Sequence, residues 1–355
     1  MTRTTTTTTQ VLEPMMRSLS ENVRTISSSN TTHATKLKLG TFASRILDAS
    51  ACVLHGFDKK DVSMVPLARE IIRASCMTLR ALPRHKEIRA KAMVLFHRTM
   101  WSMDVFNGKD CDLMSNATAP LAIHSIEHCE DMLAIMQFVN LTLKRLPLTY
   151  TVPILRDHLV SLIKAVFNSL PHLEDPSDVS AVQHSYFKFI SHILSQNMLR
   201  SILLKQGPTL LRSVLNTIVQ GCALKVLNAK ICFQIWEQLA TCWLGSDKTD
   251  GTEVRMAYAK FVYEHVTGTI FEIPMRPDFD LLDAKYNSLL KQIAKTLRCL
   301  VQSLGLDYVN FISTKYLPQK GCPPSAVNAL CAALRHDNQD LMRSLLTFFS
   351  CLKMK

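Results

Sequence analysis

Glycine and proline, the residues that most often end helices and form tight turns, are scarce in this sequence. Its 355 residues include 10 glycines and 14 prolines. A fold built from many strands needs frequent tight turns, so this composition counts against β-sandwiches and barrels. Long segments rich in leucine, isoleucine, alanine and lysine lie between the breaks instead. We therefore predict an all-α fold.

Long hydrophobic runs and closely spaced cysteine pairs are also missing. No run approaches the roughly 18 apolar residues of a membrane-spanning helix, and the start lacks a secretory signal. The 11 cysteines are scattered, none in a Cys-x-x-Cys pair, and many fall in apolar stripes. Such cysteines behave as small buried hydrophobic residues in a reducing compartment. We expect a protein inside the cell, without membrane insertion.

Sequence motifs of catalysis and of nucleotide binding are absent as well. There is no G-x-S-x-G, no Walker A motif and no G-x-G-x-x-G, and glycines are too few for a phosphate-binding loop. His124 to His128 spells H-x-x-E-H, the inverted metalloprotease pattern. A zinc site needs further ligands, so we interpret these histidines as structural. We expect no catalytic residue, no metal and no cofactor; a helical enzyme is the alternative that this histidine pair would support.

Apolar residues at helical spacing are what the sequence contains in quantity. The pattern is clearest from His184 to Gly245. Predicted helices cover residues 40–56, 64–82, 86–106, 118–147, 151–170, 178–196, 208–222, 228–244, 252–271, 279–304, 306–317, 323–335 and 338–352. Consecutive helices pair with an offset of about 50 residues, close to HEAT and armadillo repeats. We predict an α-solenoid of HEAT-like helix pairs, with a compact helical bundle as the alternative.

The first 35 residues differ from the rest in composition. Thr4 to Thr9 is a low-complexity tract with nothing to bury, and such tracts are usually disordered. We predict that residues 1–35 are largely disordered, with one short, loosely attached helix, and that residues 36–355 form the solenoid. Arginines among serines and threonines also suggest a mitochondrial transit peptide, but Glu13 and Glu21 count against it.

Positive charge exceeds negative charge, with a formal net charge of +12. Lysine and arginine side chains that neutralise phosphates release counterions, so a polyanion such as nucleic acid is the favoured partner. Aromatic residues make up only 7% of the chain. Trp101, Trp236 and Trp243 lie within apolar stripes and are interpreted as core residues. Any RNA would therefore be recognised through its shape and phosphates rather than by base stacking.

Several clusters of basic residues are the candidate phosphate contacts. The densest crosses Pro83 from one predicted helix into the next, and another lines the helix after Asp280. The candidates are Arg80, Arg84, Lys86, Arg89, Lys91, Lys144, Arg145, Lys291, Lys295 and Arg298. The alternative for each cluster is a solvated polar helix face.

A series of short motifs in the second half of the chain carries a family resemblance. The motifs are, in order, Ser185-Tyr186-Phe187-x-Phe189, Ile218-Val219-Gln220-Gly221, Lys230-x-Cys232-Phe233, Phe261-Val262-Tyr263-x-His265-Val266 and Phe279-Asp280-Leu281-x-Asp283-Ala284. In this order they resemble the C-terminal third of exportin-T, the tRNA exportin family among the importin-β (karyopherin) proteins.

The resemblance implies a HEAT-repeat solenoid that binds tRNA, by shape and backbone charge, together with the GTP-bound Ran GTPase. It further implies contact with nuclear pore proteins and shuttling between nucleus and cytoplasm. Family members are much longer, and their principal Ran-binding repeats lie N-terminal to the part that this chain resembles. The alternative function is a helical-repeat scaffold that binds protein partners and no nucleic acid.

Overall fold

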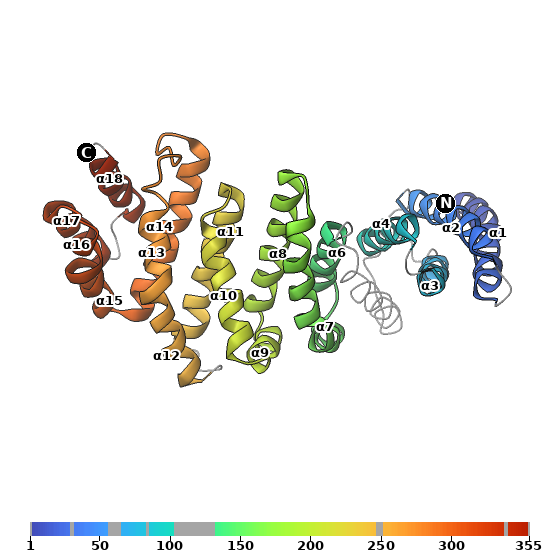
Figure 1. The fold of residues 1–355 in the computed structure, drawn as a ribbon, viewed down its shortest axis with the longest axis horizontal. Helices are drawn as coiled ribbons and strands as arrows, with labels where there is room; N and C mark the ends of the chain where they lie inside the picture. The colour runs from blue at the N-terminus through green and yellow to red at the C-terminus, as the bar shows by residue number, and fades with distance from the viewer. Residues whose placement is uncertain are drawn as a thin grey trace. The chain divides into compact units, whose positions relative to one another are not determined.

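The chain is helical throughout the part that the structure describes. The computed structural model describes residues 2–28, 32–55, 65–82, 85–102, 132–245, 251–336 and 340–353, and within these ranges it contains helices and no strand (Figure 1). This confirms the predicted all-α class. The chain divides into two compact units, Met1–Phe189 and Ile190–Lys355, which are called the N-terminal and C-terminal units below. The division falls inside helix α8.

The N-terminal unit is a stack of amphipathic helices. Helix α2 packs against α4, α4 against α6, and α6 against α7. Phe96 on α4 and Phe138 on α6 meet in the core, with their ring centroids 5.9 Å apart. The helices of this unit are α1 (Thr2–Ser27), α2 (His33–His55), α3 (Val65–Ala81), α4 (Lys86–Ser102), α6 (Met132–Arg145), α7 (Leu148–Ser169), the 3₁₀ turn η3 (Leu170–His172) and the larger part of α8 (Pro176–Ser195).

The start of the chain differs from the expected disordered segment. The structure has one helix, α1, over Thr2–Ser27, which continues through Pro14. Met16, Leu19, Val23 and Ile26 are buried, because α1 packs against α2 and α3. An apolar stripe with a partner surface gains enough from burial to order the helix. The boundary expected near residue 35 stays a prediction.

The C-terminal unit continues the same organisation. Helix α10 packs against α11, α11 against α14, and α14 against α18, and the helices of this unit are arranged in a row in Figure 1. The helices are the end of α8, α9 (Asn197–Lys205), α10 (Pro208–Cys222), α11 (Val226–Leu239), the π turn η4 (Ala240–Leu244), α12 (Thr252–Phe261), the π turn η5 (Val262–Val266), α13 (Thr267–Glu272), α14 (Ala284–Leu304), α15 (Leu306–Phe311), the π turn η6 (Ile312–Tyr316), α16 (Leu317–Gln319), α17 (Pro324–Arg335) and α18 (Leu341–Lys353). Stacking of neighbours is how HEAT-like pairs bury their apolar faces.

Most helix ends in this unit fall where the sequence predicts them. Gly207 precedes α10 with φ 94°, and Gly305 separates α14 from α15 with φ 73°. Residues with a Cβ atom rarely adopt these left-handed values, so glycine is required there. Helix α9, which is 9 residues long, was not predicted, although Leu199, Ile202 and Leu203 give it a buried apolar face.

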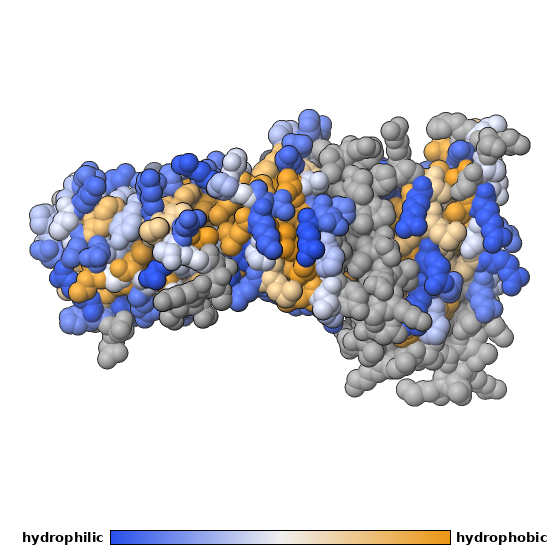
Figure 2. Space-filling view, turned by 90° about the horizontal axis from the view of Figure 1, so that it is seen from below, coloured by the Kyte–Doolittle hydropathy of each residue, from blue (hydrophilic) through white to orange (hydrophobic). Residues whose placement is uncertain are grey.

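The tryptophans of the C-terminal unit belong to its core, as predicted. Trp236 is fully buried and Trp243 is 4% exposed. The Tyr258 ring lies 6.4 Å from the Trp236 ring and 5.1 Å from the Trp243 ring, measured between centroids. The side chain of Trp101 lies outside the described residues. Figure 2 shows the complementary surface pattern, with hydrophilic side chains interspersed among hydrophobic ones, as expected for amphipathic helices.

Candidate functional site

Some of the predicted basic contacts of the N-terminal unit lie on its surface. Arg80 is exposed in the last turn of α3, and Lys86 is exposed at the first residue of α4. Lys144 is exposed in the last turn of α6, beside the half-buried Arg145. Cations in a last turn also complement the partial negative charge of the helix C-terminus. Arg80 and Lys144 are thus equally consistent with helix stabilisation and with phosphate binding.

Arg89 and Lys91, two other predicted contacts of this unit, are engaged within the fold. Arg89 is only 5% exposed, because α4 is packed between α2, α3 and α6. This burial counts against a phosphate contact at Arg89, which stays a prediction. Lys91 lies 3.0 Å from Asp48, measured from Nζ to Oδ2, in an ion pair that joins α4 to α2. Arg84 lies outside the described residues.

The predicted basic row after Asp280 lies on helix α14. Lys291, Lys295 and Arg298 follow one another at helical spacing, and both lysines are exposed. The opposite face buries Ile293 and Leu297 against the core. The spacing therefore gives one helix a polar, cationic face over an apolar one.

Arg298 is held in place at the end of this row. Its Nη1 donates a hydrogen bond to the backbone oxygen of His336, at 3.2 Å. His336 follows the last residue of α17, so the guanidinium lies at a helix C-terminus that favours a cation. Lys291 and Lys295 are consequently the members of the row that are best placed to contact a partner.

A groove was not predicted but is present in the C-terminal unit. It encloses about 730 Å³ between the turn after α10, the start of α11, the loop after α13 and the start of α14. Lys225, Lys230, Arg276 and Lys285 line it with cations, and Asp278 with a carboxylate. Because its segments, around residues 223–230 and 273–289, are remote in sequence, no local pattern could indicate it.

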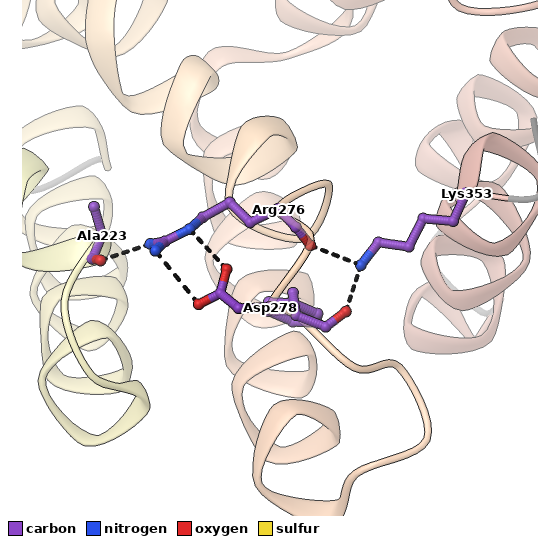
Figure 3. Close-up of polar contacts among 5 residues, drawn as sticks. Ala223, Arg276, Asp278 and Lys353 are labelled. Atoms are coloured by element: carbon purple, nitrogen blue, oxygen red, sulfur yellow. Dashed lines mark hydrogen bonds and ion pairs between the residues drawn. The ribbon is translucent and has the colours of Figure 1, made fainter.

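Arg276 ties the loop after α13 to the turn after α10 (Figure 3). Its Nη1 donates to the backbone oxygen of Ala223 at 2.6 Å. Its Nε lies 3.2 Å from Oδ1 of Asp278. One side chain therefore connects the two walls of the groove.

Lys353 on α18 attaches the other side of the same loop (Figure 3). Its Nζ donates to the backbone oxygen of Arg276 at 3.0 Å, and to that of Phe279. Desolvation lowers the pKa of Lys353, although Asp278 and Asp280 act in the opposite direction. These bonds join the loop to the last helix of the unit.

Two further predictions concern metal and membrane. His124 and His128 lie outside the described residues, so the proposal of structural histidines stays a prediction. Within residues that the structure describes, no group of three or more His, Cys, Asp or Glu side chains is arranged to hold a metal ion. None of the described helices combines the length and the apolar character needed to cross a bilayer.

Comparison with known proteins points to one family. A family model described as Exportin-T matches residues 1–353. The chain is similar to Exportin-T of Pongo abelii and of Mus musculus, each 27% identical over 236 residues, which cover 64% of this chain and 24% of each relative. Exportin-T of Dictyostelium discoideum is 20% identical over 279 residues, covering 74% of this chain and 25% of that protein. The chain thus spans about a quarter of the length of these curated relatives.

Proposed function

Because this chain belongs to the exportin-T family, we propose that it binds tRNA and takes part in the export of tRNA from the nucleus. The family match over residues 1–353 is the observation that carries the proposal. Exportins are transport receptors, so the chain is not an enzyme. Since it covers 24% of the length of its mammalian relatives, the proposal concerns its contribution to export.

The charge of the chain supports tRNA as the partner. The net charge is +12, and α14 presents Lys291 and Lys295 on an exposed face. The aromatic residues of the C-terminal core are packed against one another and so are unsuited to stacking on bases. Recognition by shape and backbone phosphates is the mode that these features favour.

The proposal extends to the partners and the route of an exportin. GTP-bound Ran would bind together with tRNA, contacts with nuclear pore proteins would let the complex pass through the pore, and the chain would shuttle between nucleus and cytoplasm. The principal Ran-binding repeats of the family lie N-terminal to the region resembled here. We therefore place tRNA binding in this chain and most of the Ran contact outside it.

Filter binding of labelled tRNA over a range of salt concentrations tests the proposal. The affinity should fall steeply with salt, by a slope of about −0.7 to −0.9 for each phosphate contact. Replacing Lys291→Glu and Lys295→Glu should weaken binding about tenfold or more and reduce the salt slope by about one to two. The loss follows from removing two phosphate contacts and adding two repulsive charges.

A matched control separates a site from bulk charge. Lys205→Glu with Lys315→Glu changes the net charge equally at two other exposed positions, and should leave most of the affinity. Equal losses in both double variants would mean that only net charge matters, and the α14 site would be withdrawn. Absence of tRNA binding at low salt would remove the tRNA proposal and leave the protein-binding scaffold.

A further inference from the structure

The groove beside the α10–α11 turn combines exposed apolar residues with an excess of cations. Leu224 is 37% exposed and Leu227 is 63% exposed. The rings of Phe279 and Tyr286 pack together in the opposite wall, with centroids 4.7 Å apart. Large apolar side chains left exposed around a cavity commonly mark a binding surface. A ligand for this groove therefore needs apolar groups of its own.

The charged side chains that line the groove indicate the sign of the charge that its ligand should carry. Arg276 is paired with Asp278, and the Lys285 Nζ lies 3.2 Å from Oδ2 of Asp283. Lys230 donates to a neutral partner, the Ser288 hydroxyl, at 2.8 Å. Lys225 is exposed at the position before α11. Lys225 and Lys230 thus supply positive charge that the one carboxylate of the lining, Asp278, does not neutralise, which favours an anionic ligand.

The walls of the groove are held before any ligand arrives. The hydrogen bond from Arg276 to Ala223 spans them, and Lys353 anchors the loop from behind. A preformed site loses less conformational entropy on binding than a flexible one. The groove can therefore bind a short peptide segment without first having to become ordered itself.

We propose that this groove binds an acidic peptide segment that carries bulky apolar side chains. Leucine or phenylalanine side chains of the peptide would cover Leu224 and Leu227, and its carboxylates would lie at Lys225 and Lys230. RNA fits less well, since its sugar-phosphate backbone offers no bulky apolar side chain to cover Leu224 and Leu227. The proposal is independent of tRNA binding.

Fluorescence anisotropy with the full chain tests the proposal. The probe is a labelled peptide of sequence Glu-Leu-Glu-Phe-Glu-Leu-Glu. Two control peptides replace its acidic residues by lysine or its apolar residues by serine. Saturable binding is expected for the probe alone, because only the probe satisfies both the cations and the apolar wall.

Variants locate the binding in the groove. Lys225→Glu with Lys230→Glu should weaken the probe at least about tenfold, since attraction becomes repulsion at both positions. Leu227→Ser should weaken it several-fold while leaving the charge unchanged. Lys205→Glu with Lys315→Glu, which lies outside the groove lining, should retain the affinity. Circular dichroism of each variant verifies that the helices are intact.

Several outcomes would overturn the proposal. These are the lack of saturable binding, equal binding of the lysine or serine peptide, and unchanged affinity in the groove variants. Displacement of the probe by tRNA at the concentration at which tRNA itself binds would assign the groove to RNA instead. If the chain binds the probe but has no affinity for tRNA, the peptide groove is supported and the proposed tRNA function is contradicted.

Discussion

At the scale of single residues, the interior of this protein accommodates basic side chains as well as apolar ones. Arg200 is 1% exposed. Its Nη1 donates to the backbone oxygen of Leu194 at 3.0 Å, and its Nη2 to Oδ1 of Asn197 at 2.6 Å. Buried charged groups need such partners, because each loses its hydration. Together with Arg89, this residue shows that part of the positive charge of the sequence is internal and unavailable to a polyanion.

Gly40 provides a prediction at this scale. A Cβ atom at this position of α2 would lie 2.5 Å from Cδ2 and 2.6 Å from Nε2 of His85. Alanine usually stabilises a helix relative to glycine by about 1 kcal/mol, but overpacking costs about 1–3 kcal/mol. We expect Gly40→Ala to lower the free energy of unfolding, measured by urea denaturation, because the contact with the imidazole ring outweighs the gain in helix propensity.

The control for Gly40 is another helical glycine with space around it. The nearest atoms to a Cβ at Gly268, Oε1 of Glu272 and the hydroxyl of Tyr316, lie 3.8 Å away. Gly268→Ala should therefore be neutral or stabilise by up to about 1 kcal/mol. Adding His85→Ala to Gly40→Ala should recover part of the loss. A Gly40→Ala protein as stable as Gly268→Ala would contradict the prediction.

At the scale of elements, the loop between α13 and α14 is held by side chains from outside itself. Within the loop, the backbone amide of Phe279 donates to the carbonyl of Arg276 at 3.1 Å. Arg276 then binds the turn after α10, and Lys353 binds the loop from α18. The loop between α13 and α14 is thus positioned by two other elements, the turn after α10 and helix α18, and these contacts hold the wall of the groove in position.

Replacing Arg276 by alanine should loosen this loop. The variant loses the bond to Ala223 and the ion pair with Asp278, and we expect a cost of about 1 kcal/mol because the side chain is partly exposed. Faster amide hydrogen exchange should appear at Phe279 and in the turn around Ala223 rather than throughout the chain. Arg255→Ala, at an exposed position of α12, serves as control. Unchanged exchange at both sites would show that Arg276 is not what holds the loop.

At the scale of the whole molecule, the chain consists of two units, each with its own core. The C-terminal unit buries Trp236, Leu290 and Tyr308 completely or almost so. Hydrogen bonds such as that from the Thr296 hydroxyl to the carbonyl of Phe233, at 2.9 Å, join its helices to one another. A unit that satisfies its apolar and polar groups internally meets the physical requirements for independent folding.

A fragment of residues 190–355 tests this independence. It should show a helical circular dichroism spectrum and unfold in one cooperative thermal transition, because the unit is compact and has its own buried core. It retains the last turn of α8, which Ser191 joins to Gln238 by a hydrogen bond of 3.1 Å. A fragment starting at Pro208 lacks α9 and that turn, and should melt at a lower temperature. A gradual, non-cooperative melt of the 190–355 fragment would contradict the prediction.

The helices and the family could be predicted from the sequence because both are determined by which residues follow one another along the chain. The spacing of apolar residues around Trp236 and the breaks at Gly207 and Gly305 are properties of consecutive residues. The order of the motifs from Ser185 to Ala284 identifies the family for the same reason. The N-terminal helix was underestimated, since its order depends on contacts with α2 and α3 that no local pattern contains.

The exposure of individual basic residues depends on how the helices pack. Arg89 and Lys291 both lie on predicted helices, yet one is covered by neighbouring helices and the other is exposed. Composition and local apolar spacing are enough to predict that the chain is basic, helical and organised in stacked pairs. Tertiary packing decided where that charge is accessible, and it assembled the groove from segments far apart in sequence. The physical reason is that burial depends on which helix covers which face, and this is a non-local property of the fold.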